Sequence, residues 1–167
     1  SIGGKDSMSG TFNDIDVPPT LVSFAVDIAK SGEIVTPELK APGNKLVRFH
    51  IEKDDFDIPV YDEVAKLYGA VHGLMKAGAI VSACAMDAKG TAAAVSRMAF
   101  GNKLGVVLEE ELTENDLFGN GLGDILAEIP ADRVGMLEEK EIDYRIVGTV
   151  SAEAAFLAAD PQAARRA

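Results

Sequence analysis

The first ten residues, SIGGKDSMSG, concentrate the residue types that bind anions. Adjacent glycines let backbone N–H groups converge on one anion, a lysine adds a positive charge, and serine hydroxyls donate hydrogen bonds. The neighbouring aspartate would repel a phosphate unless a cation lies between them, so the pattern indicates a magnesium-bridged nucleotide. The candidate ligand-binding residues are Gly3, Gly4, Lys5, Asp6, Ser7 and Ser9. Because glycine and serine also form ordinary turns, a purely structural role is an equal alternative.

The other groups that could carry chemistry favour structural roles. His50 and His72 have no histidine, cysteine or carboxylate cluster nearby at metal-ligand spacing. The single cysteine, Cys84, falls in the apolar run AIVSACAM, which is typical of a buried thiol rather than of a nucleophile. The runs EEELTEND and EEKEID lack the pattern of a calcium loop, and GNGLG lacks the lysine and spacing of a phosphate loop.

Composition restricts the class of protein. With 167 residues, of which 47% are hydrophobic, the chain suits one main domain with attachments. A formal net charge of −11 disfavours binding to nucleic acid or to anionic membranes, whose phosphates attract clustered lysine and arginine. One cysteine excludes an intrachain disulfide, and the apolar runs are shorter than the roughly 18 residues that span a bilayer. We expect a cytoplasmic protein without nucleic-acid or membrane partners.

Hydrophobic periodicity predicts alternating strands and helices. Runs of β-branched and apolar residues predict strands over 20–29, 45–52, 79–86, 103–109, 124–130 and 143–151. Apolar spacings of three and four, with proline, threonine and glycine at the boundaries, predict helices over 58–78, 90–101, 113–123 and 131–142. The Pro18–Pro19 pair marks the entry to the first strand, and residues 31–44 form a connector. The sum is an α+β layered domain with a mixed sheet and helices.

Several stretches resemble one enzyme family. The segment GGKDSMSG, followed by DVPPTLVSFAVDI and TPELKAPGNKLV, resembles the second half of the synthetase region of phosphoribosylformylglycinamidine synthase. The similarity continues more loosely through MAFGNKLGVVLE and LFGNGLGDILAEIP, to about residue 151. The resemblance implies an aminoimidazole ribonucleotide synthetase-like fold, in which an N-terminal half-barrel domain precedes a C-terminal α/β domain. Residues 1–30 would then be a loop and remnant strand of an N-terminal domain, 31–151 a C-terminal domain, and 152–167 a low-complexity tail.

The resemblance also implies a function. The family is an ATP-dependent ligase of purine biosynthesis that converts formylglycinamide ribonucleotide to its amidine, with ammonia from a glutaminase domain or subunit. ATP or ADP with Mg²⁺ would be the cofactor, and the remaining synthetase domains and the glutaminase would be the partners. Because such active sites are assembled between N- and C-terminal domains, we expect this chain alone to be inactive and to contribute to a structural or regulatory nucleotide site.

One segment departs from the family pattern. Where the family has a histidine and an Asp-Gly-Gly sequence, this chain has CAMDAKG, with Cys84 at the histidine position. Ala88 and Lys89 stand where the aspartate and the first glycine are expected. A metal-bridging carboxylate is therefore missing unless Asp87 replaces it, which leaves Asp6 and Asp87 as weak metal-binding candidates. We expect no catalytic residue in this chain.

Two alternatives stay open. The chain could belong to another member of the superfamily, such as selenophosphate synthetase or thiamine monophosphate kinase, or it could be a non-catalytic scaffold or dimerisation module. The predicted strand 20–29, which includes Phe24, would offer an unpaired apolar edge to a second copy. A homodimer is therefore one expected partner state.

Overall fold

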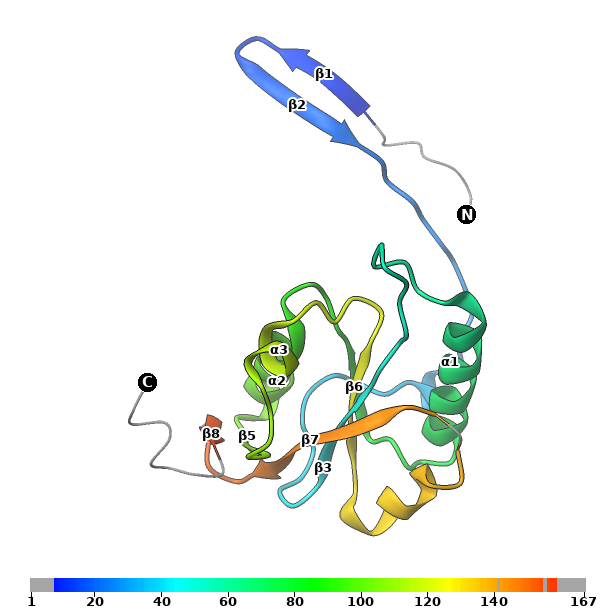
Figure 1. The fold of residues 1–167 in the computed structure, drawn as a ribbon, viewed down its shortest axis with the longest axis vertical. Coiled ribbons are helices and arrows are strands. Elements are labelled where there is room, and N and C mark those ends of the chain that lie inside the picture. Colours follow the sequence, from blue (N-terminus) through cyan, green and yellow to red (C-terminus); the bar gives the residue numbers. More distant parts are fainter. Residues whose placement is uncertain (1–7, 141, 155, 159–167) are drawn as a thin grey trace. The chain divides into compact units, whose positions relative to one another are not determined.

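The chain divides into two compact units, Ser1–Ile34 and Val35–Ala167. The computed structural model describes residues 8–140, 142–154 and 156–158 (Figure 1). In the first unit, β1 (Met8–Phe12) and β2 (Ile15–Thr20) pair as an antiparallel hairpin. Asn13 in the connecting turn has a φ of 53°, the left-handed conformation that two-residue hairpin turns favour.

The first unit corrects two predictions. Pro18 and Pro19 do not precede a strand but lie inside β2. Opposite them, the pairing register of β1 with β2 shifts between Met8 and Gly10 of β1. Proline has no backbone N–H to donate, so the irregularity accommodates the pair. The strand predicted over 20–29 is also wrong, because residues 21–30 have no regular secondary structure. Strand-forming residues need a neighbouring strand to pair with, and sequence preference alone does not supply one.

The second unit is built on a six-stranded sheet. Its strands, in spatial order, are β4 (Ser82–Ala85), β6 (Ile125–Ile129), β3 (Lys45–Phe49), β7 (Tyr144–Ser151), β5 (Gly105–Leu108) and β8 (Phe156–Ala158). Neighbouring strands pair antiparallel except β5 and β8, which pair parallel. The predicted α+β fold with a mixed sheet is confirmed.

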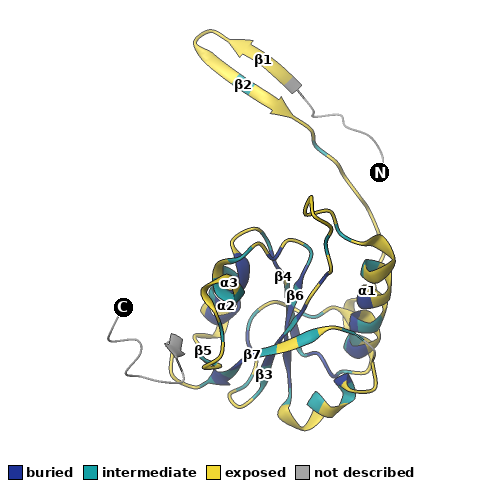
Figure 2. Ribbon diagram, in the orientation of Figure 1, coloured by how far each residue is buried: buried dark blue, intermediate teal, exposed yellow. Residues whose placement is uncertain are grey.

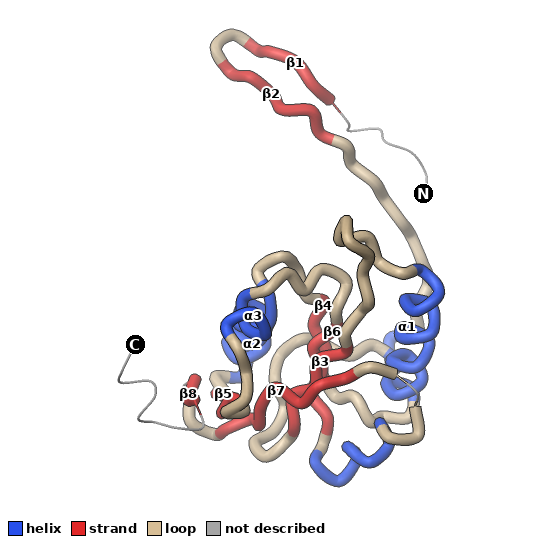
Figure 3. The backbone as a smooth tube through the Cα atoms, in the orientation of Figure 1, coloured by secondary structure: helices blue, strands red, loops and turns tan. Residues whose placement is uncertain are grey.

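Helices cover both faces of this sheet (Figure 3). Alternate residues of β3 point to opposite faces, so Leu46 packs with α2 (Gly90–Asn102), while Val47 packs with α1 (Tyr61–Lys76). The short α3 (Glu114–Phe118) lies beside α2, and the 3₁₀ helix η2 (Ala131–Leu137) buries Leu137 on the α1 side. Figure 2 shows the buried residues gathered in the sheet and on the helix surfaces that face it.

Two further elements differ from the prediction. The helix predicted over 131–142 is the shorter 3₁₀ helix η2, which follows Pro130 and contains Gly135, a poor helix former. Within the segment predicted to be a low-complexity tail, residues 156–158 form β8. A second 3₁₀ helix, η1 (Ser31–Glu33), lies in the connector. None of the helices in the described part of the chain has the length and apolar character that crossing a bilayer requires.

Candidate functional site

Of the six residues predicted to bind a nucleotide, the structure describes only Ser9. Gly3, Gly4, Lys5, Asp6 and Ser7 lie outside the described residues. Ser9 is exposed in β1. The opening-segment site therefore stays a prediction.

Asp87, the other candidate metal ligand, has protein partners. Its Oδ2 lies 3.2 Å from Nη1 of Arg97, and its Oδ1 accepts a hydrogen bond from the backbone N–H of Lys89 at 2.8 Å. Within the residues that the structure describes, no group of three or more histidine, cysteine, aspartate or glutamate side chains could hold a metal ion. Asp87 thus stabilises the turn that begins α2.

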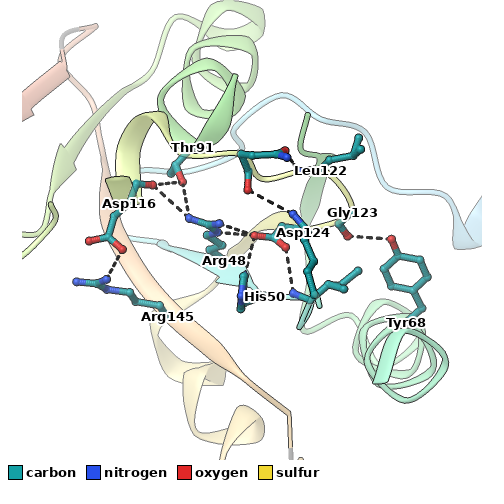
Figure 4. Close-up of polar contacts among 12 residues, drawn as sticks. Arg48, His50, Tyr68, Thr91, Asp116, Leu122, Gly123, Asp124 and Arg145 are labelled. Atoms are coloured by element: carbon teal, nitrogen blue, oxygen red, sulfur yellow. Dashed lines mark hydrogen bonds and ion pairs between the residues drawn. The ribbon is translucent and has the colours of Figure 1, made fainter. Parts of the chain in front are cut away.

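A buried ion pair lies on the α2 side of the sheet, at the end of β3 (Figure 4). Asp124 immediately precedes β6 and is fully buried. Arg48 of β3 stands opposite Leu126, and its side chain therefore reaches Asp124 two residues away on the same face. The Asp124 Oδ2 accepts from Arg48 Nε at 2.7 Å and lies 2.6 Å from Nη2. The guanidinium compensates for the burial of this carboxylate.

The chain that leaves β3 supplies two more donors to Asp124. The backbone N–H of Ile51 donates to Oδ1 at 3.0 Å, and Nδ1 of His50 lies 3.1 Å from Oδ2. Tyr68 of α1 donates its hydroxyl to the carbonyl of Gly123 at 2.8 Å. Burial, and then the charge of Asp124, raise the pKa of Tyr68. The carboxylate is therefore held by β3 and the loop that follows it, while Tyr68 of α1 binds the neighbouring backbone at Gly123.

A second ion pair connects α3 to this cluster. Arg145 Nη1 of β7 lies 2.5 Å from Asp116 Oδ1, and Thr113 forms a reciprocal capping box with Asp116 at the start of α3. The hydrogen bonds from Thr113, and then the charge of Arg145, lower the pKa of Asp116. The Asp116 carbonyl accepts from Arg48 Nη1 at 3.2 Å and from Thr91 Oγ1 at 2.7 Å.

Gly90 permits the close approach of the loop after α3. It starts α2 with a φ of 75°, and a Cβ at this position would lie 2.6 Å from the carbonyl oxygen of Gly119. A side chain would therefore push this loop away from α2.

Two cavities border the cluster. The larger, of about 300 Å³, is lined by Arg48, His50, Asn115, Asp116, Asp143, Tyr144 and Arg145. The smaller, of about 180 Å³, is lined by His50, Glu52, Glu63, Lys66, Leu67, Ile142 and Asp143. His50 and Asp143 line both. The arrangement suits a small polar ligand held by hydrogen bonds, because both arginines of the larger cavity are already paired with carboxylates.

This cluster is absent from the sites predicted from the sequence. Arg48 and Asp124 belong to predicted strands, and the sequence favours a structural role for His50. One signal was available: a charged residue among the apolar residues of LVRF marks a buried charge that needs a partner. The identity of that partner depends on the strand register, which the sequence did not reveal.

The comparisons with known proteins show the fold. Phosphoribosylformylglycinamidine synthase II from Thermotoga maritima matches with a TM-score of 0.63 and 16% identity, over 77% of this chain and 25% of that chain. T. maritima PurL complexed with FGAR matches with a TM-score of 0.62 and 15% identity, over 75% of this chain and 27% of that chain. Thiamine-monophosphate kinase from Stenotrophomonas maltophilia K279a matches with a TM-score of 0.56 and 11% identity, over 78% of this chain and 54% of that chain.

No protein-family model and no curated protein matches this chain. The chain spans about a quarter of the length of the T. maritima structures that it resembles. At these identities the comparisons establish architecture. The chain has the aminoimidazole ribonucleotide synthetase-like fold that the resemblance implied.

Proposed function

We propose that this chain is a C-terminal synthetase domain, with a remnant of the preceding N-terminal domain, of a cytoplasmic phosphoribosylformylglycinamidine synthase. The whole enzyme would convert formylglycinamide ribonucleotide to its amidine, using ATP and ammonia from a glutaminase domain or subunit. The supporting observation is the fold shared with T. maritima PurL, which has been solved with ATP, with ADP and with FGAR. The segment GGKDSMSG favours this family over the other members of the superfamily.

In this proposal the chain contributes one wall of a nucleotide or phosphoribosyl site and has no ligase activity alone. The described carboxylates around α2 are engaged with arginines, so they do not fit a magnesium site by themselves. Mg²⁺ would be held by nucleotide phosphates together with Asp6 of the opening segment. Lys5 and the adjacent glycines would bind the phosphates.

Calorimetric titration of the chain with Mg-ADP tests this proposal. We expect saturable binding that is weakened in a Lys5→Ala variant and unchanged in a Lys30→Ala variant, whose side chain is exposed in the same unit. The purified chain should form no amidine from formylglycinamide ribonucleotide, ATP and ammonia. Absence of Mg-ADP binding would favour the scaffold alternative, and measurable amidine formation would contradict the predicted inactivity.

A second candidate function, a dimerisation module, is favoured by the apolar side chains of the first unit. Large hydrophobic residues are exposed at Phe12, Ile15, Leu21, Phe24, Val26 and Ile28. Exposed apolar groups at this density are typical of a protein–protein contact. Light scattering at micromolar concentration should detect a dimer that a Phe24→Lys substitution disrupts. A monomer in both proteins would reject self-association.

A further inference from the structure

His50 is held at one edge of its ring and open at the other. Its side chain is 46% exposed, yet its Nδ1 lies 3.1 Å from an oxygen of the fully buried Asp124. The same residue lines both cavities. Figure 4 shows the ring next to Asp124, on the side of the carboxylate away from Thr91.

The partner of Nδ1 determines where the ring proton lies. An ionised carboxylate only accepts hydrogen bonds, and Asp124 already accepts from Arg48 and from the backbone of Ile51. The contact with His50 therefore requires the proton on Nδ1. In the neutral imidazole, Nε2 then carries a lone pair and is a hydrogen-bond acceptor.

Asp124 is suited to be the positioning residue for this ring. It is fully buried and bound by the Arg48 guanidinium through two nitrogens, so its oxygens have fixed positions. A fixed partner on one nitrogen orients the other nitrogen of a histidine, as it does for histidines that bind metals or substrates.

The charges around the larger cavity indicate which ligand group the ring would meet. Arg145 is paired with Asp116, Arg48 is paired with Asp124, and Asp143 adds a further carboxylate to the lining. A phosphate would find few uncommitted donors there. The unprotonated imidazole nitrogen would instead accept a hydrogen bond from an uncharged donor, such as a sugar hydroxyl or an amide N–H.

We propose that His50 contacts the ligand, with Nε2 accepting a hydrogen bond from a sugar hydroxyl or an amide N–H of a phosphoribosyl compound in the larger cavity. Asp124 positions the ring by fixing its tautomer. The inference rests on the proposed function only for the choice of compound, because the tautomer and the cavity follow from the chain itself.

Nuclear magnetic resonance of the whole chain, labelled with ¹⁵N at histidine, tests the tautomer directly. The sequence contains only two histidines, and the exposed His72 of α1 is an internal control. We expect the neutral ring of His50 to carry its proton on Nδ1. A proton on Nε2 would overturn the proposal before any ligand is added.

Titration with three probes then identifies the donor. A shift of the His50 Nε2 signal with ribose 5-phosphate would assign a sugar hydroxyl, and a shift only with formylglycinamide ribonucleotide would assign the amide. An equal shift with inorganic phosphate, or no shift with any probe, would overturn the proposal. If the His50 Nε2 signal shifts with a probe but the chain does not bind Mg-ADP, the proposed function is rejected and the role of His50 is not.

Two substitutions separate ligand binding from a structural role. His50→Gln places an amide near the Nε2 position, whereas His50→Asn places one near Nδ1 and leaves the Nε2 position empty. If Nε2 contacts the ligand, the Asn variant should bind the effective probe about tenfold more weakly, and the Gln variant should retain most of the affinity. His72→Asn is the matched control. Equal affinities for wild type and His50→Asn would overturn the proposal.

Discussion

The two ends of β6 carry two fully buried carboxylates whose surroundings differ. Asp124 before the strand pairs with the Arg48 guanidinium and, through His50, borders two cavities. Glu128 within the strand is bound by uncharged donors. These are the backbone N–H groups of Lys40 at 2.7 Å and Ala41 at 3.0 Å, the Asn44 amide at 2.6 Å and the Ser82 hydroxyl at 2.9 Å.

The different partners of the two carboxylates indicate that Glu128 is structural, whereas Asp124 belongs to the candidate site. The donors of Glu128 come from the connector before β3 and from β4, so this residue fixes the connector against the sheet. It lines neither of the two cavities described above. Burial of a charge therefore does not by itself identify a functional position. The useful feature at Asp124 is a partner, His50, that is bound on one side and accessible on the other.

Removing the cation at the Asp124 end should have the largest effect on stability. Arg48→Met leaves a fully buried carboxylate without its counter-ion, which should lower the free energy of unfolding by about 3–5 kcal/mol. Urea denaturation followed by circular dichroism measures this change. The control, Arg97→Met, breaks an ion pair with half-exposed side chains and should cost less than about 1 kcal/mol. Similar losses of unfolding free energy in the two variants would contradict the role of Arg48 as the counter-ion that stabilises buried Asp124.

At the other end of β6, Glu128→Gln should be the next most destabilising. An amide in place of the carboxylate brings an N–H group against donors that need an acceptor, at a cost of about 2 kcal/mol. The same substitution at the exposed Glu138 is the control. The histidine ring signals should not change in the Glu128 variant. A change at His50 would show that the two ends of β6 are coupled.

A smaller effect is expected where α3 meets the cluster. Thr113→Ala removes the hydroxyl that accepts from the Asp116 backbone N–H, and the loss of a helix N-cap costs about 1 kcal/mol. Thermal or urea unfolding measures it. Thr113→Ser keeps the hydroxyl and should restore most of the stability. Equal losses in both variants would show that the methyl group, rather than the cap, matters.

The smallest effect is a dependence on pH at Asp116. Its pKa is lowered in the folded chain, so its stabilising contribution is present above the ordinary value of 3.8 and is lost as pH falls through the folded value. The difference in unfolding free energy between wild type and Asp116→Asn should therefore be constant near neutral pH and shrink below about pH 4. A difference that grows on acidification would reverse the sign of this prediction.

Much of the second unit could be predicted from its sequence because each element carries a local signal. The apolar face of α1 repeats Leu67, Val71 and Leu74 at helical spacing, and all three are buried. Glycines end or begin the helices near their observed limits. The failures arose where partners decide the structure. Residues 21–30 have strand-forming composition without a strand. No predicted element corresponds to the β1–β2 hairpin, whose Asn13–Asp14 turn lies between two short runs.

The site was harder to predict than the fold for the same physical reason. Arg48 and Asp124 are 76 positions apart, and only the antiparallel register of β3 with β6 brings them together. A sequence shows that a charge in an apolar strand needs a partner, but long-range pairing selects which one. The contiguous GGKDSMSG segment was visible because its chemistry lies within eight neighbouring residues.

The strand order also determines when the sheet can form during synthesis. β3 lies between β6 and β7, and these partners begin at Ile125 and Tyr144, long after Lys45 has left the ribosome. Until then its apolar residues Val47 and Phe49 have no strand to pair with on either side in the second unit. A nascent chain in this interval would expose a β-prone segment to other chains. Contacts this distant in sequence also slow folding, so we expect chaperones that shield unpaired strands to bind the growing polypeptide.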